Sequence, residues 1–387
     1  MSSPDITDAE RRAVAEVLDT PNLSMGSRIL AFESAFRDYT GSKHAIGINS
    51  GTAGLHLCIR AAGIDEGDLV ITTPFSFVAS SNVILFERAI PVFVDIDPIT
   101  GNIDPKLVAQ AVNDLTSAES DRTRWLPRKG AEKISTLKAI LPVDVFGQPA
   151  DLDPIRTIAE EYRLIVIEDS CEALGAEYKG RKAGTLGDYG VFAFYPNKQM
   201  TTGEGAVIVT NDEQAADFMR SLRNQGRSPG DTWLQHTYLG YNYRLNEMSA
   251  ALGEIQISRL DRMIDKRSTV AEWYSERLSQ IPGIEVPTIV STTTRMSWFV
   301  YVIRLAEGIN RDEVADGLGK REIPARPYFT PIHLQPYMIN RFGYQVGDYP
   351  ITEDLGYRCL AIPFSSVMTE DQVDYVCSSL AEVINSL

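Results

Sequence analysis

A lysine and an aspartate occupy positions in the sequence where their side chains could carry covalent chemistry. Lys198 lies in a turn-like stretch between two apolar segments, 191–195 and 206–209. A lysine placed between two buried strands is either a solvated loop residue or an amine held in a pocket as a nucleophile. Asp169 follows the apolar segment 164–168, so it is either a helix N-cap or the partner of a cationic ring nitrogen. A pyridoxal phosphate enzyme needs both groups, a lysine for the aldehyde and a carboxylate for the pyridine nitrogen.

The segment Asn49–Gly54, with the sequence NSGTAG, supplies a third candidate feature. Its Ser50, Gly51 and Thr52 lie where a predicted strand turns into a predicted helix. Backbone N–H groups at a helix N-terminus bind phosphate, and small residues let the phosphate approach closely. The same three residues also suit a plain helix cap. Phe77 follows another predicted strand, where an aromatic ring either joins the core or stacks on a flat ligand.

Alternating apolar strands and amphipathic helices must position these residues. Strands are predicted at 44–49, 68–73, 91–97, 136–147 and 164–170, and helices at 8–18, 52–62, 76–88, 105–114 and 152–163. This alternation predicts an α/β fold with three layers, in which helices cover both faces of a mostly parallel central sheet. Ligands of such sheets bind beyond the carboxyl ends of the strands, where Asp169 and the NSGTAG segment fall.

The C-terminal third of the chain has a different pattern. A long helical pattern runs from Asn246 to Pro282, and it is followed by a predicted strand at 297–305 and predicted helices at 311–321 and 369–387. We therefore expect a large domain of residues 1–250 and a smaller C-terminal α+β domain of residues 251–387 that begins with a long linking helix. The polar segment 116–135 interrupts the large domain and predicts a surface excursion.

Composition and charge exclude several classes of function. The chain has 387 residues, of which 44% are hydrophobic and 23% charged, and its formal net charge is −15. An acidic globular protein of this kind is a poor partner for nucleic acid or for anionic membranes. No apolar run approaches a membrane span, and the N-terminus lacks the apolar region of a signal peptide. The four cysteines are far apart and no two of the four histidines have metal-ligand spacing, so we expect reduced thiols, no metal and a cytoplasmic location.

Several longer stretches resemble the DegT/DnrJ/EryC1/StrS family of pyridoxal-phosphate-dependent sugar aminotransferases, which have the aspartate aminotransferase fold (fold type I). They include FESAFRDYTGSKHAIGINSGTAGLHLCIRAAGI, PFSFVASSNVILFERAIPVFVDID, IEDSCEALGAEYKGRKAGTLGDYGVFAFYPNKQMTTGEGAVIVTND and LGYNYRLNEMSAALGEIQ. These stretches follow the order of the family from about Phe32 to Gln256. The resemblance implies pyridoxal 5'-phosphate as the cofactor.

The resemblance also implies a role for each matching residue. Lys198 is the Schiff-base lysine, and Asp169 faces the pyridine nitrogen. The Ser50–Thr52 segment cradles the phosphate, and Phe77 stacks on the ring. Asn242 reaches the phosphate from the neighbouring subunit, which implies a homodimer whose active sites are shared across the interface.

Three positions depart from the pattern of the family. Glu172 stands where the family often has Gln or His in contact with the ring hydroxyl. A carboxylate there is costly beside a phenolate unless it is protonated or turned away. Ala193 stands where the family often has a serine that donates to the phosphate, and Asp144 where many members have histidine.

The presence of Lys198 favours transamination over dehydration, because dehydratases that resemble this family carry histidine in place of the lysine. The expected reaction converts a keto-sugar, nucleotide-linked, to an amino-sugar, with glutamate as the amino donor. The alternatives are a sugar dehydratase and a non-catalytic regulator that kept the fold.

Contacts with the substrate are harder to predict from the sequence. Arg223 and Arg326 could bind a diphosphate, although for any single one of them a surface salt bridge is favoured. His333 aligns with a loop that approaches the substrate in the family, although a lone histidine is more often structural. Tyr195 and Trp298 are expected in the core.

Overall fold

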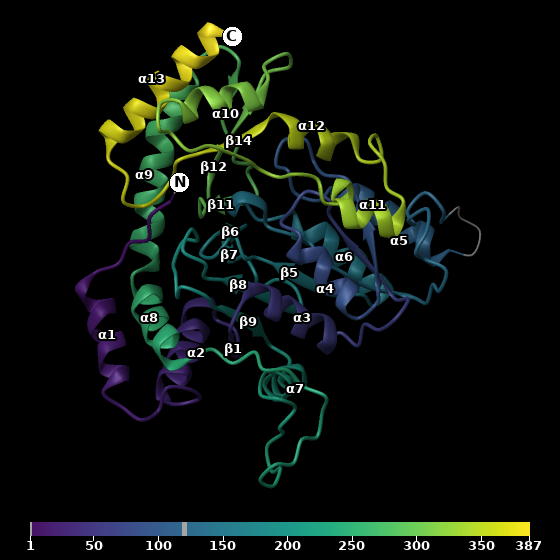
Figure 1. Cartoon of the computed structure of the whole chain (residues 1–387). Coiled ribbons are helices and arrows are strands. Elements are labelled where there is room, and N and C mark those ends of the chain that lie inside the picture. The colour runs from purple at the N-terminus through teal and green to yellow at the C-terminus, as the bar shows by residue number, and fades with distance from the viewer. Residues whose placement is uncertain (1, 118–121) are drawn as a thin grey trace.

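The computed structural model describes residues 2–117 and 122–387. Its main sheet has seven strands in the order β1-β9-β8-β5-β4-β2-β3, and it crosses the middle of Figure 1. The strands are β1 (His44–Ile48), β2 (Leu69–Thr72), β3 (Ile90–Phe93), β4 (Leu137–Ile140), β5 (Ile165–Asp169), β8 (Tyr189–Ala193) and β9 (Ala206–Thr210). The two pairs that involve β9, with β1 and with β8, are antiparallel and the other four pairs are parallel, so the predicted mostly parallel sheet is confirmed.

Helices cover both faces of this sheet, as the alternation of elements predicts. They are α2 (Ser27–Thr40), α3 (Gly51–Ala61), α4 (Ala79–Phe86), α5 (Pro105–Thr116), α6 (Leu152–Tyr162), α7 (Glu213–Arg223) and α8 (Glu247–Ser258). Side chains of α3, α4 and α7 share one core with one face of the strands. Those of α5 and α6, and those of α2 and α8, pack against the other face in two further cores.

The predicted strand at 136–147 is wrong in its extent, because β4 ends at Ile140. Pro142 follows closely and cannot donate a ladder hydrogen bond. The backbone then turns, with Phe146 in the left-handed region at φ 59° and Asp144 accepting a hydrogen bond from the Ala150 N–H at 2.8 Å. The end of β4 therefore forms an irregular loop at the carboxyl edge of the sheet.

The C-terminal part of the chain builds a second, antiparallel sheet in the order β10-β12-β14-β13. Its elements are β10 (Ile284–Glu285), β12 (Tyr301–Leu305), β13 (Arg326–Pro327) and β14 (Cys359–Ile362), with helices α9 (Leu260–Leu278), α10 (Arg311–Gly319), α11 (Pro336–Phe342), α12 (Pro350–Arg358) and α13 (Glu370–Ser386). A separate core joins this sheet to α9, α10 and α13. A small third sheet joins β11 (Thr293–Arg295) to β6 (Glu177–Tyr178) and β7 (Arg181–Lys182).

The predicted long linking helix is interrupted at Arg259, so α8 and α9 lie nearly end to end (Figure 1). The first of them packs on α2 and on the opening helix α1 (Asp8–Leu18), whereas α9 packs on α13. The predicted division between residues 250 and 251 falls inside α8, and it stays a prediction. Within the described residues, no helix combines the length and apolar character needed to cross a membrane.

The segment 116–135 is more than a surface excursion, although residues 118–121 lie outside the described part of the chain. Trp125 is buried in the core beside α5, and its Nε1–H donates to Asp114 at 2.8 Å. The Arg128 guanidinium forms a two-pronged ion pair with Asp348 at 2.5 and 2.7 Å. The segment therefore ties the large part of the molecule to the loop before α12.

Candidate active site

A cavity of about 740 Å³ opens at the carboxyl edge of the main sheet. Its walls come from the segments that follow β1, β2, β4, β5 and β8, as expected for a parallel sheet, and from two segments of the C-terminal part. Of the residues predicted from the sequence, it brings together Ser50, Gly51, Thr52, Phe77, Asp169, Glu172, Lys198 and Arg326.

Lys198 lies in the turn between β8 and β9, and its side chain is only 13% exposed. Its Nζ lies 3.7 Å from Oε1 of Glu172 and 3.9 Å from the ring centroid of Phe299. Gly203 completes the turn in the left-handed conformation at φ 78°, which favours glycine. The reading of Lys198 as a solvated loop lysine is therefore wrong.

Asp169 is the last residue of β5 and is 5% exposed. Its Oδ2 accepts a hydrogen bond from Ser80 Oγ at 2.7 Å, and its Oδ1 accepts one from the Cys171 N–H at 3.2 Å. These bonds fix the orientation of the carboxylate. Because each carboxylate oxygen has a second lone pair, Asp169 can still accept a hydrogen bond from a ligand in the cavity.

The N-terminus of α3 forms another wall of the cavity. Ser50 is the N-cap, and its Oγ accepts a hydrogen bond from the Ala53 N–H at 3.1 Å. The first N–H groups of a helix have no partner within the helix and carry partial positive charge, so they attract an anion. A Cβ added to Gly51 would lie 2.9 Å from the Cβ of Ala193 and 3.0 Å from Sγ of Cys171. Glycine therefore keeps this helix end close to β8.

Glu172 is almost completely enclosed, and burial raises the pKa of its carboxyl group despite the opposing charge of Lys198. Its Oε2 accepts a hydrogen bond from the Phe146 N–H at 3.0 Å. Burial favours the neutral acid, whereas the Phe146 N–H and the Lys198 charge favour the carboxylate. In its neutral form the group can donate a hydrogen bond to a ring hydroxyl or phenolate oxygen.

The other two departures from the family pattern have different positions. Ala193 lines the cavity and offers no side-chain donor. Asp144 lies behind the cavity wall, where burial and the nearby Glu168 raise its pKa to about 8. It is linked to Ser170 Oγ at 2.6 Å. Asp144 thus joins the loops after β4 and β5.

Sequence reasoning missed several residues of the C-terminal part that line the cavity, namely Phe299 and the segment 327–330. Burial raises the pKa of Tyr328 to about 12, with a smaller contribution from the nearby Glu172, so its phenol stays protonated. The expectation that Tyr195 is a core residue is wrong, because it is 53% exposed and lines the cavity. Trp298 is buried, as predicted. No local pattern marks these residues, since they reach the cavity only through the packing of the C-terminal part.

Three predicted residues lie elsewhere in this chain. Arg223 is buried, where its Nη1 contacts Glu33 at 2.5 Å and donates to the Gly47 carbonyl at 2.7 Å. His333 is fully buried, with its Nε2 3.0 Å from Oε1 of Glu353. Both positions contradict a substrate role. His333 matches the structural alternative, whereas Arg223 forms an ion pair that is buried and not, as the alternative predicts, at the surface. Asn242 is exposed and does not line the cavity of its own chain.

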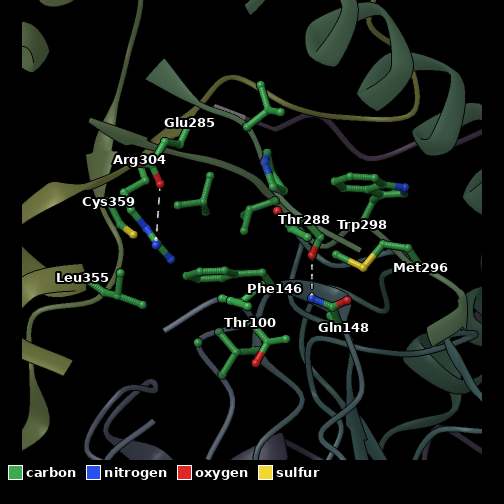
Figure 2. Close-up of a pocket in the computed structure, with 17 residues that line it drawn as sticks. Thr100, Phe146, Gln148, Glu285, Thr288, Met296, Trp298, Arg304, Leu355 and Cys359 are labelled. Carbon is green, nitrogen blue, oxygen red and sulfur yellow. Dashed lines mark hydrogen bonds and ion pairs between the residues drawn. The ribbon is translucent and has the colours of Figure 1, made fainter. Parts of the chain in front are cut away.

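A second cavity of about 200 Å³ lies between the two parts of the molecule (Figure 2). Phe146 and Trp298 line it together with Gln148, whose Nε2 donates to the Thr288 carbonyl at 3.2 Å. The backbone of Phe146 contacts Glu172 of the first cavity, so the two cavities share one wall.

The first cavity fits pyridoxal phosphate. The α3 N-terminus suits the phosphate, Asp169 suits the pyridine nitrogen, and Lys198 suits the aldehyde. Phe77 is 63% exposed and lines the cavity, which leaves its ring free to stack on a flat ligand. The buried Oδ1 of Asn197 also lines the cavity and has no hydrogen-bond partner among the described residues. A polar ligand would satisfy it.

The sequence pattern of the DegT/DnrJ/EryC1/StrS aminotransferase family matches residues 4–381. The chain belongs to this family. It is 37% identical over 387 residues to the GDP-perosamine synthase of Caulobacter vibrioides, covering 99% of this chain and 98% of the relative. It is 33% identical over 389 residues to EpsN of Bacillus subtilis, whose name describes a pyridoxal phosphate-dependent aminotransferase, covering 100% and 96% of the two chains.

A solved structure supports the same assignment. PseC of Helicobacter pylori, an aminotransferase involved in the biosynthesis of pseudoaminic acid, has a TM-score of 0.89 and 27% identity and covers 100% of this chain and 99% of its own. The family member described here is therefore a pyridoxal-phosphate-dependent aminotransferase with the fold type I architecture.

Proposed function

We propose that this aminotransferase moves an amino group from glutamate to a keto-sugar that is carried on a nucleoside diphosphate. The observation that carries the proposal is the enclosed Lys198 amine, which faces a cavity that also holds Asp169 and the α3 N-terminus. The names of two relatives, GDP-perosamine synthase and the pseudoaminic acid enzyme PseC, point to amino-sugars as products. The first name also points to a nucleoside diphosphate as the carrier.

Each residue of the cavity has a definite task in this proposal. When bound, pyridoxal phosphate supplies an aldehyde carbon and an electron-withdrawing ring. The Asp169 carboxylate would accept a hydrogen bond from the ring nitrogen and favour its protonated form. Nζ of Lys198 removes the proton from the α-carbon of glutamate, and in the second half-reaction it delivers a proton to the sugar carbon that gains the amine. The Phe299 ring, whose centroid lies 3.9 Å from this nitrogen, keeps water away from it.

Arg326 is our candidate for the anionic part of the substrate. It lines the cavity, is exposed, and donates to the Ala325 carbonyl at 3.3 Å, and no ion pair involves it in the described part of the chain. A free guanidinium can bind a diphosphate or a carboxylate through two parallel hydrogen bonds. The acidic net charge of the chain makes such a local cation necessary.

We also propose a homodimer in which Asn242 serves the cavity of the partner subunit. The loop between α7 and α8 projects from the body of the chain in Figure 1 and exposes the apolar side chains of Trp233, Leu234 and Leu239, by 83%, 66% and 82%. A second copy covering this loop would remove them from water. We further propose a cytoplasmic location, because all four cysteines are free thiols.

The absorption spectrum of the reconstituted protein tests the reaction. We expect the visible band of the lysine-bound cofactor in wild type, and its loss when glutamate converts the cofactor to the amino form. Lys198→Ala should show neither this band nor the half-reaction, whereas Lys106→Ala, on the exposed face of α5, should behave as wild type. A nucleotide-linked keto-sugar should then restore the band.

Two outcomes would contradict the proposal in different ways. A wild-type protein that shows no band with pyridoxal phosphate would favour the regulator. A band that ignores glutamate would exclude glutamate as the donor, and product analysis with the keto-sugar alone would then test the dehydratase.

A further inference from the structure

Arg267 is a buried cation that has no task in the proposed reaction. It lies on α9 and is 2% exposed, among the largest fully enclosed side chains of the described residues. Burying a charged group is costly unless its donors are satisfied. No ion pair joins Arg267 to a carboxylate in the described part of the chain, so its partners must be found elsewhere.

Three backbone carbonyls accept hydrogen bonds from the two terminal nitrogens of this guanidinium, whereas its Nε–H has no hydrogen-bond partner among the described residues. Its Nη2 donates to the carbonyl of Lys198 at 2.8 Å. Its Nη1 donates to the carbonyls of Trp298 and Phe299 at 3.0 and 3.2 Å. Arg267 thus joins α9 to two separate segments of the chain, the turn between β8 and β9 and the segment before β12.

The same two segments meet again inside the active-site cavity. Nζ of Lys198 lies 3.9 Å from the ring centroid of Phe299, and both residues line the cavity. The side chains of these two residues are therefore in contact on the cavity side, while Arg267 joins their main chains on the other side. A shift of either backbone would change the position of the lysine nitrogen in the cavity.

The backbone at Trp298 explains how two successive carbonyls reach one nitrogen. Trp298 has φ 53°, in the left-handed region that a bulky residue rarely adopts. Such a conformation persists only where the surroundings stabilise it. The Trp298 ring is held in place by stacking on Tyr301, with centroids 5.7 Å apart, and lines the second cavity beside Met296 (Figure 2). The main-chain carbonyl of Trp298 is fixed by its hydrogen bond from Arg267.

We propose that Arg267 is a positioning residue for the catalytic lysine, acting through the main-chain carbonyls of Lys198 and Phe299. The role needs a planar guanidinium, because its separate N–H groups reach carbonyls from two segments at once. A lysine at this position would offer a compact ammonium that cannot span both segments in the same way. An apolar side chain would leave all three carbonyls without a donor.

Hydrogen exchange of the cofactor-free protein tests the positioning role without reference to catalysis. We compare Arg267→Met, Arg267→Lys and the control Arg358→Met, because Arg358 also donates to a backbone carbonyl, that of Leu305 at 3.0 Å, but lies in the C-terminal part away from the cavity. In Arg267→Met, amides of the turn at 196–204 should exchange at least about tenfold faster than in wild type. In Arg267→Lys, the exchange rates of these amides should lie between those of wild type and Arg267→Met. In the control, they should equal the wild-type rates.

The reconstituted enzyme supplies the second readout. In Arg267→Met the glutamate half-reaction should slow by roughly a hundredfold, with a much smaller change in the glutamate KM, because a small displacement of a reacting group lowers kcat. The visible circular dichroism of the bound cofactor should change with it. Arg267→Lys should recover part of the rate.

Wild-type exchange in the turn together with a wild-type half-reaction in Arg267→Met would overturn the inference. If that variant does not fold, Arg267→Lys decides in the same way, since wild-type values for it would show that the guanidinium is not needed. The inference concerns Lys198 in the reaction of the family. A failure of wild type to react with glutamate would contradict the proposed donor but leave the exchange result to decide on Arg267.

Discussion

Lys198 is held from three sides, and each contact has a different chemical character. The Glu172 carboxyl group and the Phe299 ring lie beside its nitrogen, and Arg267 binds its main-chain carbonyl. The side chain is thereby enclosed and directed into the cavity. An amine that must alternate between binding a cofactor and moving a proton gains from such restriction, because little motion is needed between the two tasks.

Glu172 gives the enzyme a pH dependence that glutamine would remove. Burial raises the pKa of this carboxyl group, so the folded protein keeps the proton at a pH where the unfolded chain has lost it. Stability of the cofactor-free protein should therefore fall as pH rises from the ordinary pKa of a glutamate through the raised value. Glu172→Gln should flatten this part of the curve, as measured by urea unfolding at a series of pH values.

The matched control is Glu161→Gln, which changes an exposed glutamate on α6 and should keep the wild-type slope. Glu172→Gln should also retain the glutamate half-reaction within about threefold, because the amide has the same shape, keeps an oxygen to accept the Phe146 N–H and offers a hydrogen-bond donor to the cavity. Equal slopes for wild type and Glu172→Gln would show that Glu172 is ionised in the fold.

The sequence alone was enough to predict the cavity residues that lie at or just after the end of a strand. Asp169 ends a strand, Lys198 and Gly51 follow strands, and all three lie at the carboxyl edge of the sheet. The buried position of Arg223 could not be predicted, because its partner Glu33 lies 190 positions away and leaves no local signal. The buried position of Arg267 does have a local signal in the sequence. It lies on the apolar face of α9 with Ile264 and Ala271, where helical spacing predicts burial.

At the scale of elements, the short distance between α3 and β8 decides how well the helix end can receive an anion. A Cβ at Gly51 would press on Ala193 and Cys171 and push the helix N-terminus away from the sheet. Gly51→Ala should therefore weaken binding of pyridoxal phosphate by about tenfold or more, through loss of helix N–H contacts to the phosphate. Fluorescence titration of the cofactor-free protein with pyridoxal phosphate measures this change.

Gly319→Ala is the matched control, because a Cβ at this α10 position would meet nothing within 4 Å. It should leave cofactor affinity unchanged. If Gly51→Ala binds pyridoxal phosphate as tightly as wild type, the added methyl group does not displace the N-terminus of α3 from a bound phosphate. The phosphate would then have to bind elsewhere in the cavity.

The predicted boundaries of helices and strands are correct where the sequence pattern is regular. They are wrong where a turn or a break in the backbone ends an element before its apolar pattern ends. The opening helix spans Asp8–Leu18 as predicted, because a capping box formed by Thr7 and Glu10 begins it. By contrast, β4 stops before Pro142, although the apolar pattern continues. The break between α8 and α9 at Arg259 has no comparable signal in the helical spacing, since apolar residues continue across it.

At the scale of the whole molecule, the exposed position of Asn242 makes the shared active site testable. We expect two chains per particle by light scattering. We also expect mixtures of Lys198→Ala and Asn242→Ala chains to regain glutamate half-reaction activity that neither variant has alone. In a mixed dimer, one cavity combines the intact lysine of one chain with the intact asparagine of the other.

Asn242 acting within its own chain would give the opposite result, because both cavities of a mixed dimer would then carry a defect. The control is a mixture of Lys198→Ala with Lys106→Ala, in which the Lys106→Ala chain contributes an intact lysine and asparagine. The activity of this mixture should be proportional to the fraction of Lys106→Ala chains in it.

The cavity wall draws on residues from Ser50 to Thr330, and Arg267 fastens the lysine from a helix that belongs to the C-terminal part. During synthesis the wall of this cavity therefore stays incomplete until the chain extends as far as Thr330. Fragments that stop before α9 would carry Lys198 in a turn that lacks both the Arg267 contact and the Phe299 ring. In a cell, tight retention of pyridoxal phosphate would thus mark chains that are both finished and folded.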